Sequence, residues 1–159
     1  MSRVSRPIVA ARRMAASPQA LFEFLSDLER HWLLDDRFVE VLTLERAPGT
    51  GRAVGGSVRV RGPCGLARTA RTHVVDSSPH TRMSGTAEVG RHTRAQVTWT
   101  LTPDGGMTLV RLEAAIQRIG PGDALLLALG GRGWMRRRFG AILATLERRA
   151  LGAAQSRSA

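Results

Sequence analysis

Two stretches of strictly alternating residues, joined by a tight turn, constrain the fold of this chain more than any other feature. In residues 94–102 the odd positions are apolar, whereas the even positions hold arginine, glutamine or threonine. The segment PDGG, Pro103–Gly106, is a strong hairpin signal, and the alternation resumes in residues 110–117. A period of two residues is typical of strands with one buried and one wet face. The sequence therefore predicts an antiparallel hairpin in a sheet that is covered on one side.

Further strands are predicted before this hairpin. The β-rich or alternating segments are Ile8–Met14, Val39–Leu44, Ser57–Arg61, Leu66–Val75 and Arg82–Val89. The segments between them are rich in glycine, proline, aspartate or serine, which favour turns and loops: Ala47–Gly56, Gly62–Gly65 and Asp76–His80. Together with the hairpin, these segments predict a sheet of about seven strands.

Two short helices are predicted after the first strand. Ser17 and Pro18 have the residue types preferred at the cap and the first position of a helix. Apolar residues then recur at helical spacing as far as Leu28. A second short helix is expected over residues 29–34, with Trp32 as its anchor.

The longest helix is predicted near the C-terminus, over residues 124–151. Its apolar stripe consists of Met135, Phe139, Ile142 or Leu143, and Leu146. The segment GGRG, Gly130–Gly133, is expected to break or kink it, because each interior glycine costs about 1 kcal/mol relative to alanine. Residues 152–159 are expected to be a disordered tail, so that residues 3–151 form a single domain.

Charge and residue usage exclude several kinds of chemistry. The chain has 24 basic and 13 acidic residues, a formal net charge of +11, and every basic residue is arginine. Because lysine and tyrosine are absent, Schiff-base lysine chemistry and tyrosine acid–base chemistry are excluded. The single cysteine, Cys64, excludes an internal disulfide and a cysteine-based zinc cluster. The arginine excess reflects either a GC-rich genome or a surface suited to anions such as nucleic acid, phospholipid or an acidic partner.

Membrane insertion and export are not expected. The longest unbroken apolar run, Ala124–Leu129, is much shorter than the about 20 residues that a membrane-spanning helix requires. The N-terminal arginines are not accompanied by an apolar stretch of signal-peptide length. We therefore expect a cytoplasmic protein.

The order of the elements indicates an α+β fold. One strand is followed by two short helices, about six strands of antiparallel sheet and a long C-terminal helix. The dry face of the sheet must be covered, and only the last helix is long enough to cover it. A curved sheet that surrounds one long helix leaves a cavity between them.

The order of several local motifs resembles a known superfamily. These motifs are ASPQALFEFLSDLERHW (Ala16–Trp32), Gly55–Gly56, VVDSSP (Val74–Pro79), LTPDGGMTLVRLEAAI (Leu101–Ile116) and FGAILATLERRA (Phe139–Ala150). They are similar to the START / Bet v 1-like (SRPBCC) superfamily, and most similar to its bacterial polyketide cyclase/dehydrase and lipid-transport branch. The resemblance implies a helix-grip fold with a hydrophobic ligand held between sheet and helix. Its members include carriers, sensors, cyclases, aromatases and hydratases, so the resemblance does not fix the chemistry.

Apolar residues on the dry face and on the helix are the candidate ligand-binding residues, together with one arginine. They are Trp32, Val60, Arg68, Met83, Val97, Trp99, Leu112, Trp134, Met135 and Phe139. For Trp99, packing in the core and lining of a cavity are alternatives, which differ only in whether a void remains beside it. Methionine is flexible and suits a pocket that accepts varied apolar shapes, which favours Met135.

The strand Leu66–Val75 has two alternative registers. If Leu66, Ala70, Thr72 and Val74 point inward, Arg68 does so too; in the other register Arg71 and His73 point inward. We favour the first, because it buries more apolar surface. A buried guanidinium must be paired, and a ligand carboxylate or phenolate could pair with it. The alternative is an arginine whose head group reaches the rim and stays in water.

No catalytic, cofactor or metal site is assigned. His31 and Asp35 have metal-like spacing if they lie on one helix, but no third ligand is near in sequence. No serine lies in a nucleophile-elbow pattern, and GTGRAVGG, residues 49–56, lacks the strand-loop-helix context of a phosphate loop. Whether the protein is an enzyme is left open.

The arginine-rich segment Arg132–Arg138 is interpreted as either a solvated helix face or a contact for anionic phospholipid. Trp134 lies beside the glycine break and is either an anchor at the helix flank or a guard of an entrance. On the second interpretation, the cavity opens near Gly130–Trp134.

Three functions are compatible with these observations. We favour a small hydrophobic-ligand carrier or sensor, which requires no catalytic group. The alternative is a polyketide cyclase or aromatase, which would require at least two convergent polar side chains in the cavity. A nucleic-acid-associated regulator is suggested by charge alone, and nucleic acid is not the expected partner because no base-reading motif is present. Transient contact with an anionic membrane surface is compatible with the first function.

Overall fold

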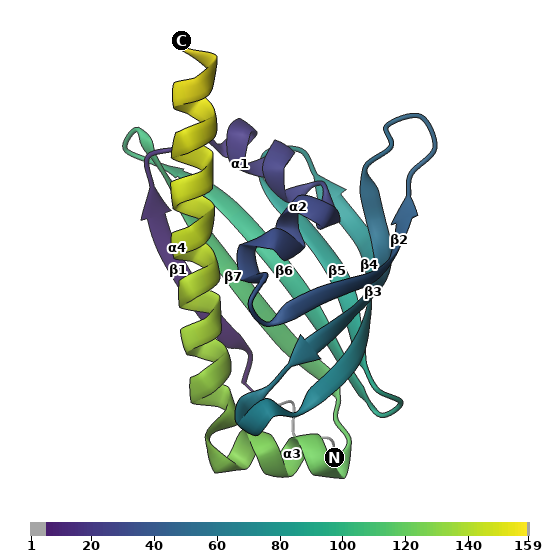
Figure 1. Ribbon diagram of the computed structural model, residues 1–159. Coiled ribbons are helices and arrows are strands. Elements are labelled where there is room, and N and C mark those ends of the chain that lie inside the picture. The colour runs from purple at the N-terminus through teal and green to yellow at the C-terminus, as the bar shows by residue number, and fades with distance from the viewer. Residues whose placement is uncertain (1–5, 159) are drawn as a thin grey trace.

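The computed structural model describes residues 6–158, so the first residues of the predicted domain and residue 159 of the predicted tail lie outside it. It contains one seven-stranded antiparallel sheet with the order β1-β7-β6-β5-β4-β3-β2 (Figure 1). The strands are β1 (Ile8–Met14), β2 (Val39–Arg46), β3 (Ala53–Arg61), β4 (Ala67–Ser78), β5 (Arg82–Val89), β6 (Thr93–Asp104) and β7 (Met107–Arg118). The predicted α+β class and the number of strands are confirmed.

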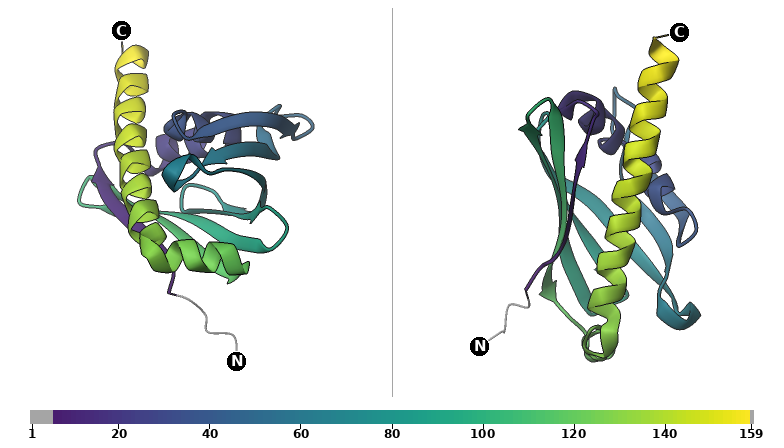
Figure 2. Two further views of the ribbon diagram at one scale, coloured as in Figure 1. Left: turned by 60° about the horizontal axis from the view of Figure 1, so that its bottom comes forward. Right: turned by 90° about the vertical axis from the view of Figure 1, so that its left-hand side faces the viewer.

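Helices follow the first and the last strand, as predicted. After β1 come α1 (Pro18–Leu25), α2 (Leu28–Trp32) and the 3-10 turn η1 (Leu33–Asp35), and a further 3-10 turn, η2 (Pro63–Gly65), joins β3 to β4. After β7 come α3 (Pro121–Leu126), the π-helical segment η3 (Leu127–Gly131) and α4 (Arg132–Arg157). The sheet is curved, and α1, α2 and α4 lie on its concave side (Figure 2). No helix in residues 6–158 is long and apolar enough to cross a membrane.

The β6–β7 hairpin has the predicted alternation. Trp99 faces Leu112 and Leu101 faces Val110 across the two strands, and all four side chains are buried. The turn between the strands is formed by Gly105 and Gly106 with φ of 58° and 81°. Because side chains disfavour this left-handed region, two glycines here are what a tight hairpin requires. This hairpin therefore provides the centre of the dry face.

Strands β3 and β4 are longer than predicted. Gly55 and Gly56, which we expected in a loop, lie within β3, because β2 approaches them closely: a Cβ on Gly56 would lie 2.1 Å from the carbonyl oxygen of Thr43. Strand β4 continues to Ser78 rather than ending at Val75. A bulge in β4 after Val74 lets the strand extend with Val75 exposed.

The two short helices are capped locally and anchored by apolar residues. Ser17 Oγ accepts a hydrogen bond from the amide of Ala20 at 3.1 Å, as its position before Pro18 predicted. Asp27 Oδ1 accepts from the amide of Glu29 at 3.1 Å and caps α2. Leu28 and Trp32 of α2 are buried beneath the helix, so the predicted anchor role of Trp32 is confirmed.

The long helix α4 lies along one edge of the sheet. It packs mainly against β1 (Figure 1). Arg12 of β1 forms an ion pair with Glu147 of α4. Leu146 belongs to the same buried cluster as Trp99 and Leu112, while Phe139 packs around that cluster, as predicted from the stripe. The expectation that α4 alone covers the dry face is wrong, because α1 and α2 cover the part over β4–β6 and leave α4 the β1–β7 side.

The helix continues beyond the expected end of the domain. Residues 152–157, which we expected to be disordered, belong to α4. The side chains after Ala150 are exposed, and Ser156 Oγ donates to the carbonyl oxygen of Gly152 at 3.0 Å. Alanine and glutamine in this segment are good helix formers, which favours continuation of the helix although its side chains are exposed. The division into a domain over residues 3–151 and a separate tail stays a prediction.

Candidate ligand-binding cavities

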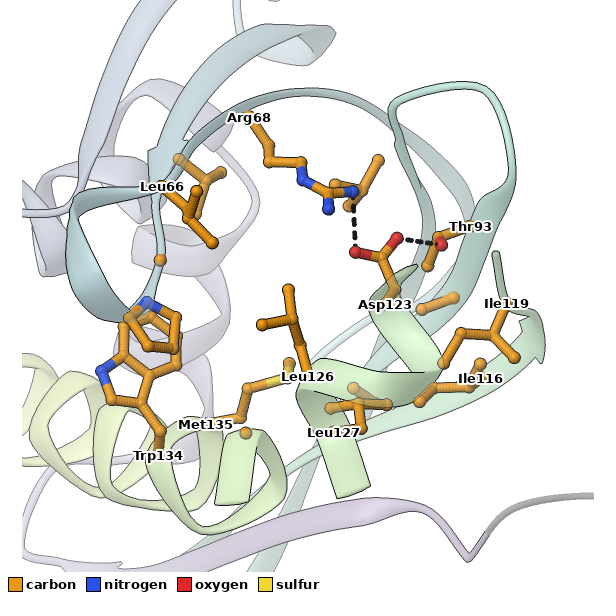
Figure 3. A pocket seen from close by; sticks show the side chains of 17 residues that line it. Leu66, Arg68, Thr93, Ile116, Ile119, Asp123, Leu126, Leu127, Trp134 and Met135 are labelled. Atoms are coloured by element: carbon orange, nitrogen blue, oxygen red, sulfur yellow. Dashed lines mark hydrogen bonds and ion pairs between the residues drawn. The ribbon is translucent and has the colours of Figure 1, made fainter. Parts of the chain in front are cut away.

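A cavity of about 220 Å³ lies where α3, η3 and the start of α4 cover the sheet (Figure 3). Most side chains that line it are apolar: Val60, Leu66, Val89, Ala95, Ala114, Ile116, Ile119, Leu126, Leu127, Trp134 and Met135. Strands β3–β7 form one wall, and the helical segments form the other. We call it the first cavity.

Arg68 and Asp123 form the polar corner of the first cavity (Figure 3). Arg68 Nη1 lies 2.7 Å from Asp123 Oδ1, and Thr93 Oγ1 donates to the other carboxylate oxygen. The amide of Gly120 donates to Thr93 Oγ1 at 3.1 Å, so this network holds the start of α3 against β6. The carboxylate balances the guanidinium charge within the protein itself.

The structure resolves the register of β4 in favour of the inward Arg68. Arg68 lines the first cavity and Ala70 is buried, whereas the side chain of His73 is 58% exposed. The sequence left open two partners for Arg68, a ligand or bulk water, and the structure adds a third within the protein. This partner is Asp123, because the first turn of α3 docks over the start of β4, and the Arg68 side chain remains 38% exposed.

Trp134 lies in a cluster of aromatic and charged side chains at the edge of the first cavity. Its ring meets the ring of Phe38 edge to face, with centroids 6.1 Å apart. The guanidinium carbon of Arg138 lies 3.7 Å from the Phe38 centroid, a cation–π contact, and Arg138 also pairs with Asp35. Burial lowers the pKa of Arg138. Arg138 therefore ties α4 to η1 rather than belonging to a solvated arginine face.

The predicted glycine break is confirmed and forms part of the cavity wall. Leu129 and Gly130 leave helical geometry, and Gly130 has a φ of 110°. A Cβ on Gly131 would lie 2.6 Å from the carbonyl oxygen of Leu126, so this close approach requires glycine. The break turns the chain between α3 and α4, which lie at a steep angle (Figure 1). As a result, Leu126 and Leu127 line the cavity instead of continuing along α4.

A second cavity of about 140 Å³ lies between α2 and strands β4–β6. His31 of α2 lines it, and its ring meets the Trp99 ring edge to face with centroids 5.1 Å apart. Burial lowers the pKa of His31 to about 4, so its imidazole is neutral at pH 7. No third potential metal ligand joins His31 and Asp35, since residues 6–158 contain no group of three such ligands.

The predicted binding residues divide between the two cavities and the core. Val60, Arg68, Trp134 and Met135 line the first cavity. Trp32, Met83, Val97 and Trp99 line the second. Leu112 is a buried core residue, and Phe139 packs against the core; neither lines a cavity. Their roles in binding stay predictions.

Sequence reasoning missed Thr93, Asp123, Leu126 and Leu127 in the first cavity and His31 in the second. Gly120 occupies the cap position of α3, so the carboxylate of Asp123 is available to Arg68. The segment GPGD, Gly120–Asp123, marks the start of α3, but nothing in it indicates where this helix docks.

The sequence profile of a known family, described as polyketide cyclase / dehydrase and lipid transport, matches residues 6–151. The chain belongs to this family. Membership of this family implies a cavity that binds a hydrophobic ligand. No curated protein matches the chain significantly.

Solved structures share the fold over nearly the whole chain. The protein TTHA0849 from Thermus thermophilus is similar with a TM-score of 0.69 and 23% identity over 93% of this chain and 99% of that chain. A START superfamily protein from Mycobacterium smegmatis is similar with a TM-score of 0.69 and 16% identity over 92% of this chain and 98% of that chain. These likenesses confirm the predicted START-like, helix-grip fold.

Proposed function

We propose that the protein binds a small hydrophobic molecule in the first cavity and acts as its carrier or sensor. The observation that carries this proposal is the lining of the cavity. It is almost entirely apolar, and its charged residues, Arg68 and Asp123, neutralise each other. Apolar walls with a few fixed polar groups are typical of small-molecule sites. Because the ion pair is closed, a neutral apolar ligand leaves no charge unpaired.

Native mass spectrometry of the purified protein tests this proposal directly. We expect the mass spectrum to show a retained lipid or polyketide-like molecule. In a separate fluorescence titration, we expect the protein to take up an apolar fluorescent probe. Ala95→Leu places a larger side chain in the first cavity and should weaken probe binding at least about tenfold, since its volume is taken from the ligand. Ala115→Leu, the same substitution outside the cavity lining, is the matched control. Equal probe binding by both variants would refute the site.

We also propose that ligands exchange through the region Gly130–Trp134 at an anionic membrane surface. Leu125 and Leu129 are 60% and 76% exposed on the side of α3 and η3 that does not line the cavity. Arg136 and Arg137 are exposed on the adjoining start of α4. Exposed leucines beside arginines suit an interface that combines an apolar layer with anionic head groups.

Vesicle assays separate this exchange route from binding in solution. Probe transfer should be faster to vesicles that contain phosphatidylserine than to phosphatidylcholine vesicles. Leu129→Ser should slow transfer to the anionic vesicles, whereas Leu151→Ser, at the opposite end of the helical segment, should not (Figure 1). Equal transfer rates for both variants and both vesicle types would contradict the route while leaving the cavity proposal intact.

The alternative function is a polyketide cyclase or aromatase acting in the same cavity. The observation in its favour is the convergence of two polar side chains, Arg68 and Asp123, at one corner of the apolar cavity. These groups could orient a poly-β-ketone and move protons. If so, Arg68→Gln should abolish turnover of a short poly-β-ketone while an apolar probe still binds. Absence of turnover by the unmodified protein favours the carrier or sensor.

A further inference from the structure

Two residues that line the second cavity each carry a buried polar side-chain atom without a hydrogen-bond partner. Among the described residues, such side-chain atoms occur in His31, Asp35, Trp99 and Arg138. Asp35 and Arg138 form an ion pair with each other. The remaining two atoms, His31 Nδ1 and Trp99 Nε1, belong to residues that line the same cavity. Because buried polar atoms are nearly always hydrogen-bonded, their concentration in one cavity indicates a binding function.

The chemistry of the two atoms restricts what can satisfy both. An indole Nε1–H only donates, so its partner must accept. The imidazole of His31 is neutral, because burial lowers its pKa to about 4, and a neutral imidazole nitrogen can accept a hydrogen bond. The two rings are in edge-to-face contact, with centroids 5.1 Å apart. A hydroxyl can accept from the indole and donate to the imidazole, because its oxygen has free lone pairs and carries one proton.

Charged groups fit this cavity poorly. A carboxylate needs a cation, and no arginine among residues 6–158 lines the second cavity. The other titratable residue in the lining is His73, whose exposed imidazole lies 3.6 Å from Glu45. An ammonium group only donates and therefore cannot accept from Trp99. A neutral hydroxyl satisfies both atoms without bringing an unpaired charge into the interior.

The remaining lining favours an aromatic or other flat apolar body on the hydroxyl. Leu28, Trp32, Met83 and Val97 supply apolar surface around the two polar atoms. The cavity volume of about 140 Å³ is far above the roughly 10–15 Å³ that a single water molecule needs. The space is therefore suited to a small ring rather than to one ordered water.

We propose that the second cavity binds a small phenol or enol, whose hydroxyl oxygen accepts a hydrogen bond from Trp99 Nε1–H and whose hydroxyl proton is donated to His31 Nδ1. This site goes beyond the apolar binding proposed for the first cavity and does not depend on it, because the two cavities share no lining residue in the part of the chain that the structure describes. The two sites can therefore be tested separately.

The tryptophans provide resolved reporters for the two cavities. The chain has three tryptophans: Trp32 and Trp99 line the second cavity, and Trp134 lines the first. Titration with phenol, followed by ¹H–¹⁵N correlation spectra of the indole groups, should shift the Trp99 resonance strongly. Toluene, which has a similar ring and no hydroxyl, should bind the second cavity about tenfold more weakly, as two lost hydrogen bonds of ordinary strength imply.

Variants identify the two polar atoms. Trp99→Phe removes the indole N–H but keeps an aromatic ring, and His31→Phe removes the imidazole nitrogens. Each removes one of the two hydrogen bonds and should lower the phenol-to-toluene affinity ratio from about tenfold to about threefold. His92→Phe is the matched control, since His92 is exposed and lines neither cavity. It should keep the tenfold ratio.

Measurements on the unmodified protein keep the proposal falsifiable if a variant fails to fold. Equal affinity for phenol and toluene, or an unshifted Trp99 resonance at saturating phenol, would overturn it. The same holds if only the Trp134 resonance responds, because phenol would then occupy the first cavity alone. A second cavity that contains only water would show neither the shift nor the preference.

Discussion

The two cavities lie on the same concave face, yet they differ in whether their buried polar groups have partners. In the first, Arg68, Thr93 and Asp123 satisfy one another, and the rest of the lining is mostly apolar. In the second, His31 and Trp99 each have a buried nitrogen without a partner. In each cavity a residue from a helix meets a residue from a strand. The first turn of α3 brings a carboxylate to an arginine, whereas α2 brings an imidazole to an indole.

This contrast separates two kinds of recognition on one scaffold. Where the charged groups of an apolar wall pair with each other, ligands are selected by shape and hydrophobicity, because no polar group of the wall lacks a partner. Unpartnered donors and acceptors favour ligands with complementary groups, since a ligand lacking them leaves the buried atoms unsatisfied. The predictions below test each side of this contrast.

The largest expected effect is a pH dependence of stability that originates in the second cavity. The pKa of His31 is about 4 in the folded protein, against 6.5 for an unperturbed histidine. Between these values the unfolded chain binds a proton that the folded protein does not, so stability falls as the pH decreases from 6.5 to 4. At about 1.4 kcal/mol for each pKa unit, the loss is about 3 kcal/mol.

Urea unfolding at a series of pH values measures this effect. His31→Phe should show a shallower loss of stability in this range, and His92→Phe should behave like the unmodified protein. Carboxylates contribute equally to all three proteins, so the difference between curves isolates His31. Parallel curves for His31→Phe and the unmodified protein would show that His31 titrates normally.

A smaller effect is expected at the wall of the first cavity. Gly131→Ala places a Cβ 2.6 Å from the carbonyl oxygen of Leu126, so the backbone between α3 and α4 must shift. We expect a loss of about 2 kcal/mol, as for other overpacked sites, together with weaker apolar-probe binding. Thermal unfolding and probe titration measure the two effects.

Gly133→Ala is the control for this prediction. Gly133 is helical, and a Cβ there would meet only Arg137 Nη1, at 3.8 Å. Alanine should therefore stabilise the helix by up to about 1 kcal/mol. If both alanine variants were equally stable, the close approach at Gly131 would not matter. The Trp99 resonance should be unchanged in both variants, because Trp99 lies in the other cavity.

The smallest effect is expected from opening the ion pair of the first cavity. Asp123→Asn removes the carboxylate that pairs with Arg68 but keeps a similar shape. The stability cost should be only about 1 kcal/mol, because the Arg68 side chain is 38% exposed and water screens its charge. The freed guanidinium should make the first cavity prefer an apolar carboxylate over the corresponding alcohol by about fivefold.

Competition between a fatty acid and the alcohol of equal length measures this preference. The unmodified protein should discriminate little between the two, since its arginine is already paired. An Asp123→Asn variant with no preference would mean that Arg68 is satisfied by solvent and that the ion pair does not govern selectivity.

Much of the fold follows from local patterns in the sequence. Alternation in residues 94–102 determines which side chains of β6 face inward. Burial of the larger apolar surface likewise predicted the register of β4 in which Arg68 points inward. Ser17 capped α1 as its position predicted, and GGRG broke the C-terminal helix. These features depend on neighbours in the chain, such as hydrogen bonds within a turn and the side-chain period of a strand.

Only the tertiary structure decided where the helices dock and therefore what the cavities contain. The pairing of Arg68 with Asp123 and the contact of His31 with Trp99 each join segments that are far apart in the sequence. The placement of α4 along β1 and β7 left room for α2 over β4–β6, and so produced two cavities in place of the single one expected. The physical reason is that periodicity specifies which face of an element is buried. Which element packs against that buried face depends on how the apolar faces of all helices are arranged on the one sheet. No single segment of the sequence specifies this arrangement.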